Sequence, residues 1–181
     1  MAEKQLAELK ARCADLAAVR ARLEPSARHE ATLPQRDTYF VVRHGRLKLR
    51  ETTGGPAQLI FYERPDVATV KPSRIRLAEI ADGPALRALL ESALGVRARV
   101  VKRREIWWWQ GVQVHLDTVD GLGTFLEFEA TIEDAPAALA RAEEHLRRLL
   151  AKLDVPLTAL VAGSYADLLG WLTGEPGQPL A

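Results

Sequence analysis

Charged residues and leucines alternate without interruption in the run Gly45-Arg46-Leu47-Lys48-Leu49-Arg50-Glu51. In a β-strand successive side chains point to opposite faces, so the three cations share one face and the two leucines share the other. A helix would spread the same cations around its circumference. The alternation therefore predicts a strand with a cationic face. Taken alone, such a face is more typical of a solvent-exposed strand, so its meaning depends on the other strands.

The same kind of pattern predicts most of the remaining elements. Alternating runs rich in β-branched and aromatic residues predict strands over 37–43, 46–51, 58–64, 73–80, 96–104, 112–119 and 124–131. Leucines at helical spacing predict helices over 85–94, over 134–153 with Asp134 as the N-cap, and over a short stretch that begins after Ser164 and includes Trp171 and Leu172. Segment 24–36 contains two prolines and few apolar residues, which predicts a loop.

The N-terminal segment fits two structures. Helix formers dominate residues 2–23 and neither Gly nor Pro interrupts them, which favours a single helix. Residues 6–12 also alternate as a strand would, with Glu8, Lys10 and Arg12 on one face. From Asp15 onward the segment fits only a helix, and Asp15 is a potential N-cap.

The predicted strands share one property, a leucine-like face opposite a face of ionisable groups. The signs of charge are segregated, because two or three strands carry only cations and two carry mainly acids. Besides the opening run, these residues are Lys102, Arg104, His115, Asp117, Glu127 and Glu129. A randomly solvated face would mix the signs along each strand. If the sheet closes on itself, the charged faces line an interior that water and anions can enter, and the helices cover the leucine face. The pattern thus favours an α+β fold in which a barrel with a polar lumen has helices packed outside, while closure itself does not follow from periodicity.

Such an interior suits a metal and a phosphorylated ligand. Glu127 and Glu129 would point the same way, roughly 6.6 to 6.8 Å apart along their strand. This spacing is too long for sharing one proton closely but suits a single Mg²⁺ or Mn²⁺ ion. Opposed Arg and Lys side chains would bind phosphate oxygens. Two roles remain open for His115. It could contact metal or phosphate, or it could be a polar residue that only lines the interior.

Composition narrows the functional classes. The 181 residues suit one domain, which we place at 1–173, followed by a Gly- and Pro-containing tail at 174–181 that we expect to be mobile. The formal net charge of +1 provides no global field for nucleic acid, so an anion site requires local clustering. The single cysteine excludes an internal disulfide and fits a reducing compartment. Because no apolar run could span a bilayer and no signal-peptide core is visible, we expect a cytoplasmic protein that binds no membrane.

Six segments together resemble a known family. They cover 35–40, 45–51, 62–66, 101–104, 115–129 and 164–169, the longest of them being His-Leu-Asp-Thr-Val-Asp-Gly-Leu-Gly-Thr-Phe-Leu-Glu-Phe-Glu. They are similar to the CYTH family, and within it to the class IV adenylyl cyclase-like branch of the triphosphate tunnel metalloenzymes. The resemblance runs in order from about Glu8 to Leu169. It implies a closed antiparallel barrel of eight strands whose tunnel binds a triphosphate and a divalent metal.

The resemblance also implies a role for each matching residue. The implied metal ligands for Mg²⁺ or Mn²⁺ are Glu8, Asp117, Glu127 and Glu129. The implied triphosphate contacts are Lys10, Arg46, Lys48, Arg64, Lys102 and Arg104, with Arg12 and Arg50 on the same faces and Lys71 contributing from a loop. Glu8, Lys10, Glu127 and Glu129 would form the catalytic set. Because Glu8 and Lys10 match the family's N-terminal Glu-x-Glu-x-Lys signature, we expect a strand over 4–12 instead of the helix.

One position departs from the family pattern. The first carboxylate of the N-terminal signature falls at Leu6, which cannot bind metal, and this weakens the case for a second metal ion. The resemblance implies an enzyme that converts ATP to cyclic AMP and pyrophosphate, and this branch suggests a homodimer. Two alternatives stay open. One is hydrolysis of inorganic triphosphate, thiamine triphosphate or a nucleoside triphosphate. The other is non-catalytic binding of polyphosphates or phosphorylated metabolites, which Leu6 favours.

Overall fold

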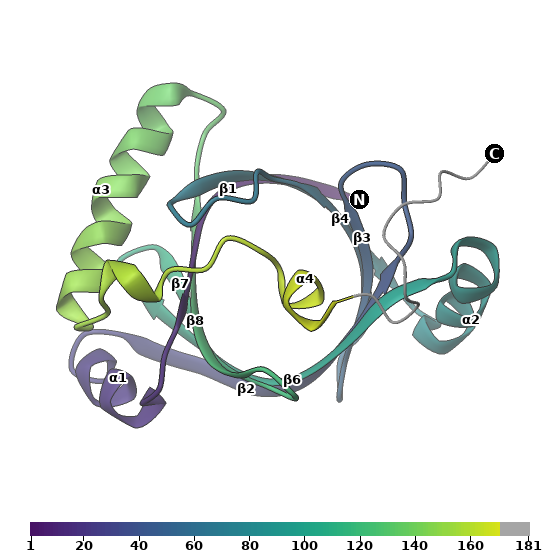
Figure 1. Cartoon of the computed structure of the whole chain (residues 1–181), viewed down its shortest axis with the longest axis horizontal. Coiled ribbons are helices and arrows are strands. Elements are labelled where there is room, and N and C mark those ends of the chain that lie inside the picture. The colour runs from purple at the N-terminus through teal and green to yellow at the C-terminus, as the bar shows by residue number, and fades with distance from the viewer. Residues whose placement is uncertain (171–181) are drawn as a thin grey trace.

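Eight antiparallel strands close into one barrel, in the order β1-β5-β4-β3-β2-β6-β7-β8. The structure is a computed structural model that describes residues 1–170, and Figure 1 shows its ring of strands end on. The strands are β1 (Ala2–Arg12), β2 (Arg28–Phe40), β3 (Arg46–Thr52), β4 (Ala57–Glu63), β5 (Lys71–Ile80), β6 (Val96–Trp109), β7 (Val112–Val119) and β8 (Gly123–Thr131). The predicted α+β fold with a closed eight-stranded barrel is confirmed.

The N-terminal segment is a strand, β1. The family resemblance predicts this correctly, and the helix predicted from residue propensity is wrong. β1 pairs with β5 along one edge and with β8 along the other, and these two pairings close the barrel. Two ladders of backbone hydrogen bonds outweigh the few tenths of a kcal/mol per residue by which propensity favours a helix. The register places Glu8 beside Glu129 and Lys10 beside Glu127.

Several predicted boundaries are wrong, among them the end of β2, which stops at Phe40 and not at Arg43. β2 begins at Arg28, so most of the predicted loop over 24–36 is strand. Pro34 lies inside it, opposite Arg103 of β6 and one residue before the pairing with β3 begins at Gln35. Its carbonyl accepts from Thr53 N on the β3 side, so the missing N–H interrupts no hydrogen bond to β6. β6 continues to Trp109, five residues beyond the predicted end. β5 begins at Lys71, which therefore lies on a strand and not on a loop.

The helices are α1 (Leu16–Leu23), α2 (Gly83–Leu94), α3 (Pro136–Lys152) and α4 (Tyr165–Leu169), with a short 3₁₀ helix, η1, at Leu157–Ala159. Asp15 caps α1 as expected, because its side chain accepts a hydrogen bond from Ala18 N at 2.9 Å. The predicted cap of α3 is wrong: Ala135 occupies the N-cap, and Asp134 instead pairs with Arg74 at 3.1 Å. Trp171, Leu172 and the tail at 174–181 lie outside the described residues.

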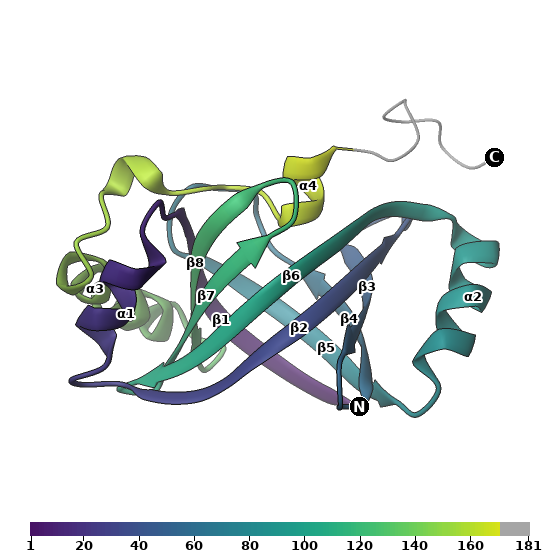
Figure 2. The ribbon, with the colours of Figure 1, turned by 90° about the horizontal axis from the view of Figure 1, so that it is seen from below.

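The helices cover the leucine face of the barrel, which turns the charged face inward. α1 and α3 pack on one side of the ring and α2 on the other (Figure 1). Leu23 and Leu146 are fully buried against outward-facing residues of β1, β7 and β8 such as Leu9 and Phe128. Each buried leucine contributes about 1.5 to 3 kcal/mol. α4 lies across one end of the barrel (Figure 2), where Tyr165 is buried.

None of the helices within residues 1–170 has the length and apolar composition that crossing a membrane requires.

Candidate functional site

The barrel encloses a cavity of about 590 Å³ that receives side chains from all eight strands and from α4. Eight of the residues predicted for the site line it: Glu8, Lys10, Lys48, Arg64, Lys102, Arg104, Glu127 and Glu129. Seven of them come from four strands that are distant in sequence, β1, β3, β6 and β8, and Arg64 directly follows β4. The seven meet because each occupies an inward position of its strand. Arg50, His115, Tyr62 and Tyr165 line the same cavity.

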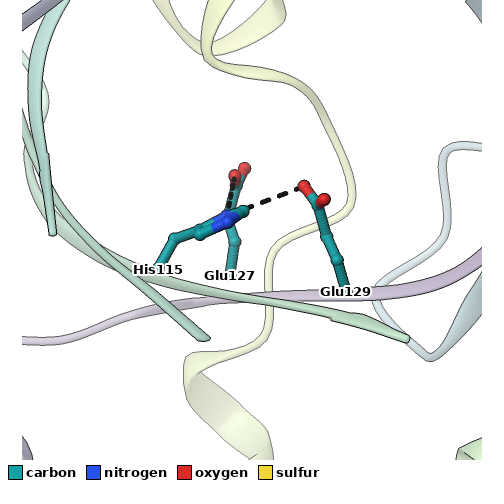
Figure 3. Close-up of side chains that lie close together, drawn as sticks. All are labelled: His115, Glu127 and Glu129. Atoms are coloured by element: carbon teal, nitrogen blue, oxygen red, sulfur yellow. Dashed lines mark ion pairs between the residues drawn. The ribbon is translucent and has the colours of Figure 1, made fainter. Parts of the chain in front are cut away.

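A histidine and two glutamates form the one group of potential metal ligands found among the described residues. His115 of β7 lies opposite Glu127 of β8 in the strand register, and Glu129 is two residues further along. His115 Nδ1 lies 3.8 Å from Glu127 Oε2 and 3.6 Å from Glu129 Oε1 (Figure 3). One potential ligand atom from each residue lies within 4.8 Å of the other two.

The donor atoms of this group fit a divalent cation. Carboxylate oxygens suit Mg²⁺ and Mn²⁺, and imidazole nitrogen suits the first-row transition ions. His115 is only 2% exposed, and its Nδ1 atom has no hydrogen-bond partner. A buried ring nitrogen without a partner, aimed at two carboxylates, is the arrangement that a bound cation would complete.

Lys10 and Arg104 keep Glu127 ionised. Lys10 Nζ lies 2.8 Å from Glu127 Oε1, and Arg104 donates to the other oxygen. Burial alone would raise the pKa of Glu127, but the two cations outweigh burial and hold that pKa well below its usual range. The carboxylate is therefore charged at neutral pH, and both of its oxygens already face cations.

Glu8 and Asp117 differ in their relation to the cluster. Glu8 faces the same cavity, and its Oε2 accepts a hydrogen bond from Arg64 at 2.6 Å. Burial raises the pKa of Glu8, with Glu129 adding to the effect and Arg64 opposing it. Asp117 is completely buried and does not join the cluster. Its oxygens bind Arg104 Nε at 2.8 Å and the Tyr165 hydroxyl at 2.8 Å, so Asp117 orients the guanidinium and anchors α4.

The cationic wall is organised around Asp37, which the sequence analysis did not single out. Its side chain accepts hydrogen bonds from Lys48 at 3.0 Å, from Lys102 at 3.3 Å, and twice from Arg50 at 2.8 Å. Burial would raise the pKa of Asp37, but these cations hold it well below its usual range. Burial also lowers the pKa of Lys48 to about 8 and that of Lys102 to about 7. One carboxylate thus faces three cations.

Residues 5–165 match the family model of the CYTH domain. The chain belongs to the CYTH family. Members of this family are typically enzymes, and the CYTH fold binds triphosphate substrates.

One relative is similar to this chain in sequence, and solved structures share its fold. A candidate adenylate cyclase from Methanocaldococcus jannaschii is 26% identical over 127 residues, which span 68% of this chain and 70% of the relative. A solved structure from Pyrococcus horikoshii has a TM-score of 0.80 at 20% identity, covering 90% of this chain and 98% of that chain. The structure of a candidate adenylate cyclase from Vibrio parahaemolyticus has a TM-score of 0.79 at 22% identity, covering 92% and 98%.

Three cations that the CYTH resemblance assigns to the triphosphate do not line the main cavity. Arg46 lies at a second cavity, where its Nη2 donates to Asp66 at 2.5 Å and to Asp167 of α4 at 2.9 Å. Arg12 is exposed and donates to a backbone carbonyl at 3.2 Å. Lys71 is buried, and its Nζ donates to three backbone carbonyls, so it braces loops.

The departure from the CYTH signature is visible in the cavity. Leu6, where a carboxylate is expected, is 5% exposed and lines the cavity. Five other aliphatic side chains line it as well, three of them on β4 and β5 (Ile60, Ile75 and Leu77) and one each on β2 and β6 (Leu33 and Ile106). The lumen therefore combines a polar wall on β6, β7 and β8 with a more apolar wall on β4 and β5.

Proposed function

We propose that this CYTH protein is a divalent-metal-dependent enzyme that binds the triphosphate of a nucleotide in the lumen and converts ATP to cyclic AMP and pyrophosphate. The observation that carries the proposal is that the His115, Glu127 and Glu129 group shares one cavity with the cationic wall. The candidate adenylate cyclases among its relatives support this reaction.

The cations of the cavity would bind the phosphate oxygens. Arg104 uses its Nε and Nη2 atoms on Asp117 and Glu127, which leaves its Nη1 donors for a ligand. Arg64 donates through Nη1 to Glu8, and its buried Nε has no partner. Both guanidinium groups are thus held in place by a carboxylate while donors remain free, which reduces the entropy lost on binding.

In the proposed reaction the substrate's 3′-hydroxyl attacks its own α-phosphorus and forms the new ester bond, the phosphoanhydride bond between the α- and β-phosphates breaks to release pyrophosphate, and the hydroxyl proton passes to water. Glu127 and Glu129, with Glu8 facing them, would hold Mg²⁺ or Mn²⁺, which would neutralise charge on the phosphate oxygens and stabilise the leaving pyrophosphate. Lys10, Lys102 and Arg104 would fix the phosphate chain in line for displacement. Their positive charges would also offset the charge that develops on the leaving group.

Leu6 is the reason to test two other activities of the same cavity. With one carboxylate fewer than the family signature, a second cation that would activate the attacking group lacks a ligand. Water could then attack a terminal phosphate of inorganic triphosphate, thiamine triphosphate or a nucleotide. Alternatively, the cavity would bind such molecules without turnover.

Product analysis separates the three activities. The purified protein is incubated with Mg²⁺ or Mn²⁺ and with ATP, inorganic triphosphate or thiamine triphosphate, and the products are resolved by anion-exchange chromatography. Equal amounts of cyclic AMP and pyrophosphate would support the proposed cyclase. Orthophosphate would support hydrolysis, and binding without product would support the third activity. The exposed Glu133, just beyond β8, provides a control variant, Glu133→Gln, which should leave turnover unchanged.

A further inference from the structure

We infer that His115 binds the metal directly through Nδ1 and gives the site a preference for Mn²⁺ over Mg²⁺. This inference rests on the proposed metal site and specifies its donor set. It concerns which atoms hold the cation and not which reaction follows.

The tautomer of His115 is set by Gln113, two residues earlier on β7. His115 Nε2 lies 3.0 Å from Gln113 Oε1. With the amide of Gln113 oriented so that its oxygen faces the ring, Nε2 carries the proton and donates it to Gln113. In the neutral ring Nδ1 then keeps its lone pair, which is the form that binds metals.

The Nδ1 atom is buried, and the carboxylate oxygens nearest to it, at 3.6 Å and 3.8 Å, lie beyond hydrogen-bond distance. The ring is 2% exposed, and no hydrogen-bond partner reaches Nδ1. Leaving a buried acceptor unpaired is unfavourable, so the position calls for a ligand. Nδ1 points between Glu127 and Glu129, toward the place where their two carboxylates would hold a cation (Figure 3).

Proximity, and not freedom from cations, selects the donor set. Glu127 pairs with Lys10 and Arg104 just as Glu8 pairs with Arg64 and Asp117 with Arg104. Among the described residues, His115, Glu127 and Glu129 are the group whose ligand atoms lie within 4.8 Å of one another, and Leu6 removes a further oxygen donor. The inferred donor set is two carboxylates and one imidazole, with open positions for water or phosphate oxygens.

A nitrogen donor changes which ion the site prefers. Mg²⁺ binds oxygen ligands almost exclusively, with near-ideal octahedral geometry and several retained waters. Imidazole suits the first-row transition ions, whose affinities rise from Mn²⁺ toward Cu²⁺. Among the two ions expected for this site, the imidazole of His115 strengthens the binding of Mn²⁺ much more than that of Mg²⁺.

The test uses Mn²⁺ alone, without substrate. Electron spin-echo spectroscopy of Mn²⁺ bound to the wild-type protein should show coupling to a nitrogen nucleus, and the coupling should change when histidine is labelled with ¹⁵N. This measurement needs no variant, so it does not depend on a substituted protein folding. The His115→Gln variant should lose the coupling and bind Mn²⁺ at least roughly tenfold more weakly, while its affinity for Mg²⁺ changes less than about threefold.

The control variant is His44→Gln, because His44 is exposed in a turn outside the cavity and should leave coupling and affinities unchanged. Mn²⁺ bound to the wild type without nitrogen coupling would overturn the role of His115 and leave the proposed function standing. Equal losses of Mn²⁺ and Mg²⁺ affinity in His115→Gln would overturn the inferred selectivity and would also leave the proposed function standing. A wild-type protein that binds neither ion but still turns ATP over would overturn the metal site itself.

Discussion

Lys102 Nζ lies 3.3 Å from Asp37 Oδ2 at a point of the lumen where each side chain is 1% exposed. The same carboxylate also receives hydrogen bonds from Lys48 and Arg50. A buried ion pair is costly to desolvate, and here two further cations share its one negative charge. The excess positive charge is the feature that a bound polyphosphate would neutralise.

Removing the charge of Asp37 should destabilise the free protein and increase its response to anions. Asp37→Asn leaves three buried cations without a counter-charge, so we expect the unfolding free energy to fall by about 3 to 5 kcal/mol in chemical denaturation. Inorganic triphosphate should raise the melting temperature of this variant more than that of the wild type. Asp66→Asn, which alters a carboxylate that is 49% exposed, is the control and should cost under about 1 kcal/mol. If Asp37→Asn has the same unfolding free energy as the wild type, Asp37 is not the counter-charge that stabilises these three cations.

Triphosphate binding should take up protons at mildly alkaline pH. Burial lowers the pKa of Lys102 to about 7 and that of Lys48 to about 8, so both amines lose protons as the pH of the free protein rises from 7 to 9. A bound anion favours the charged amine and raises its pKa, so affinity should fall between pH 7.5 and pH 9. Calorimetry at pH 8 in buffers of different ionisation enthalpy measures the uptake directly. Lys102→Met should reduce it, and binding without proton uptake would refute the assignment.

Arg46 and Arg64 both line the second cavity, but only Arg64 also lines the main cavity, so the two should contribute unequally. Arg64→Gln should weaken triphosphate binding by roughly tenfold to a hundredfold, because it removes charge-assisted hydrogen bonds from the main cavity. Arg46→Gln should weaken it less than about threefold, since Arg46 lies at the second cavity between Asp66 and Asp167. Equilibrium titration of both variants with inorganic triphosphate makes the comparison. An equal loss in the two variants would place Arg46 in the binding site after all.

The attachment of α4 can be tested at Tyr165. Tyr165→Phe removes the hydroxyl that donates to Asp117 at 2.8 Å, and we expect a loss of about 1.5 to 3 kcal/mol in unfolding free energy. The ring stays in place beneath Lys10 Nζ, which lies 3.7 Å from its centroid. Tyr165→Leu also removes this cation–π contact and should cost up to about 2 kcal/mol more. If denaturation curves of the two variants coincide, the ring contributes nothing beyond its hydroxyl.

The inward charged faces could be predicted from sequence because side-chain direction in a strand depends only on odd or even position. Arg46, Lys48 and Arg50 therefore share a face whatever the neighbouring strands are. Closure of the barrel could not be predicted from this periodicity. It depends on the pairing of β1 with both β5 and β8, and helix propensity in β1 points the other way.

The residues that sequence analysis missed or misplaced depend on contacts between distant strands. Asp37 begins one predicted strand, but its partners come from β3 and β6 and are defined only by the register. Asp117 matches a family motif, yet its contact with Tyr165 depends on where α4 crosses the barrel end. The inward position of Asp37, two residues before the buried Tyr39, was the available signal.

The most direct test of the proposed site is a calorimetric titration of inorganic triphosphate, with Mn²⁺ present or removed by a chelator. In the wild type we predict that the metal tightens triphosphate binding by roughly tenfold or more, because cation and phosphate oxygens would bind one another in the lumen. In the Glu127→Gln, Glu129→Gln double variant, with its fold checked by circular dichroism, the metal should have no such effect and turnover should be lost. A wild-type protein that binds no triphosphate, or a double variant in which the metal effect persists, would contradict the proposal.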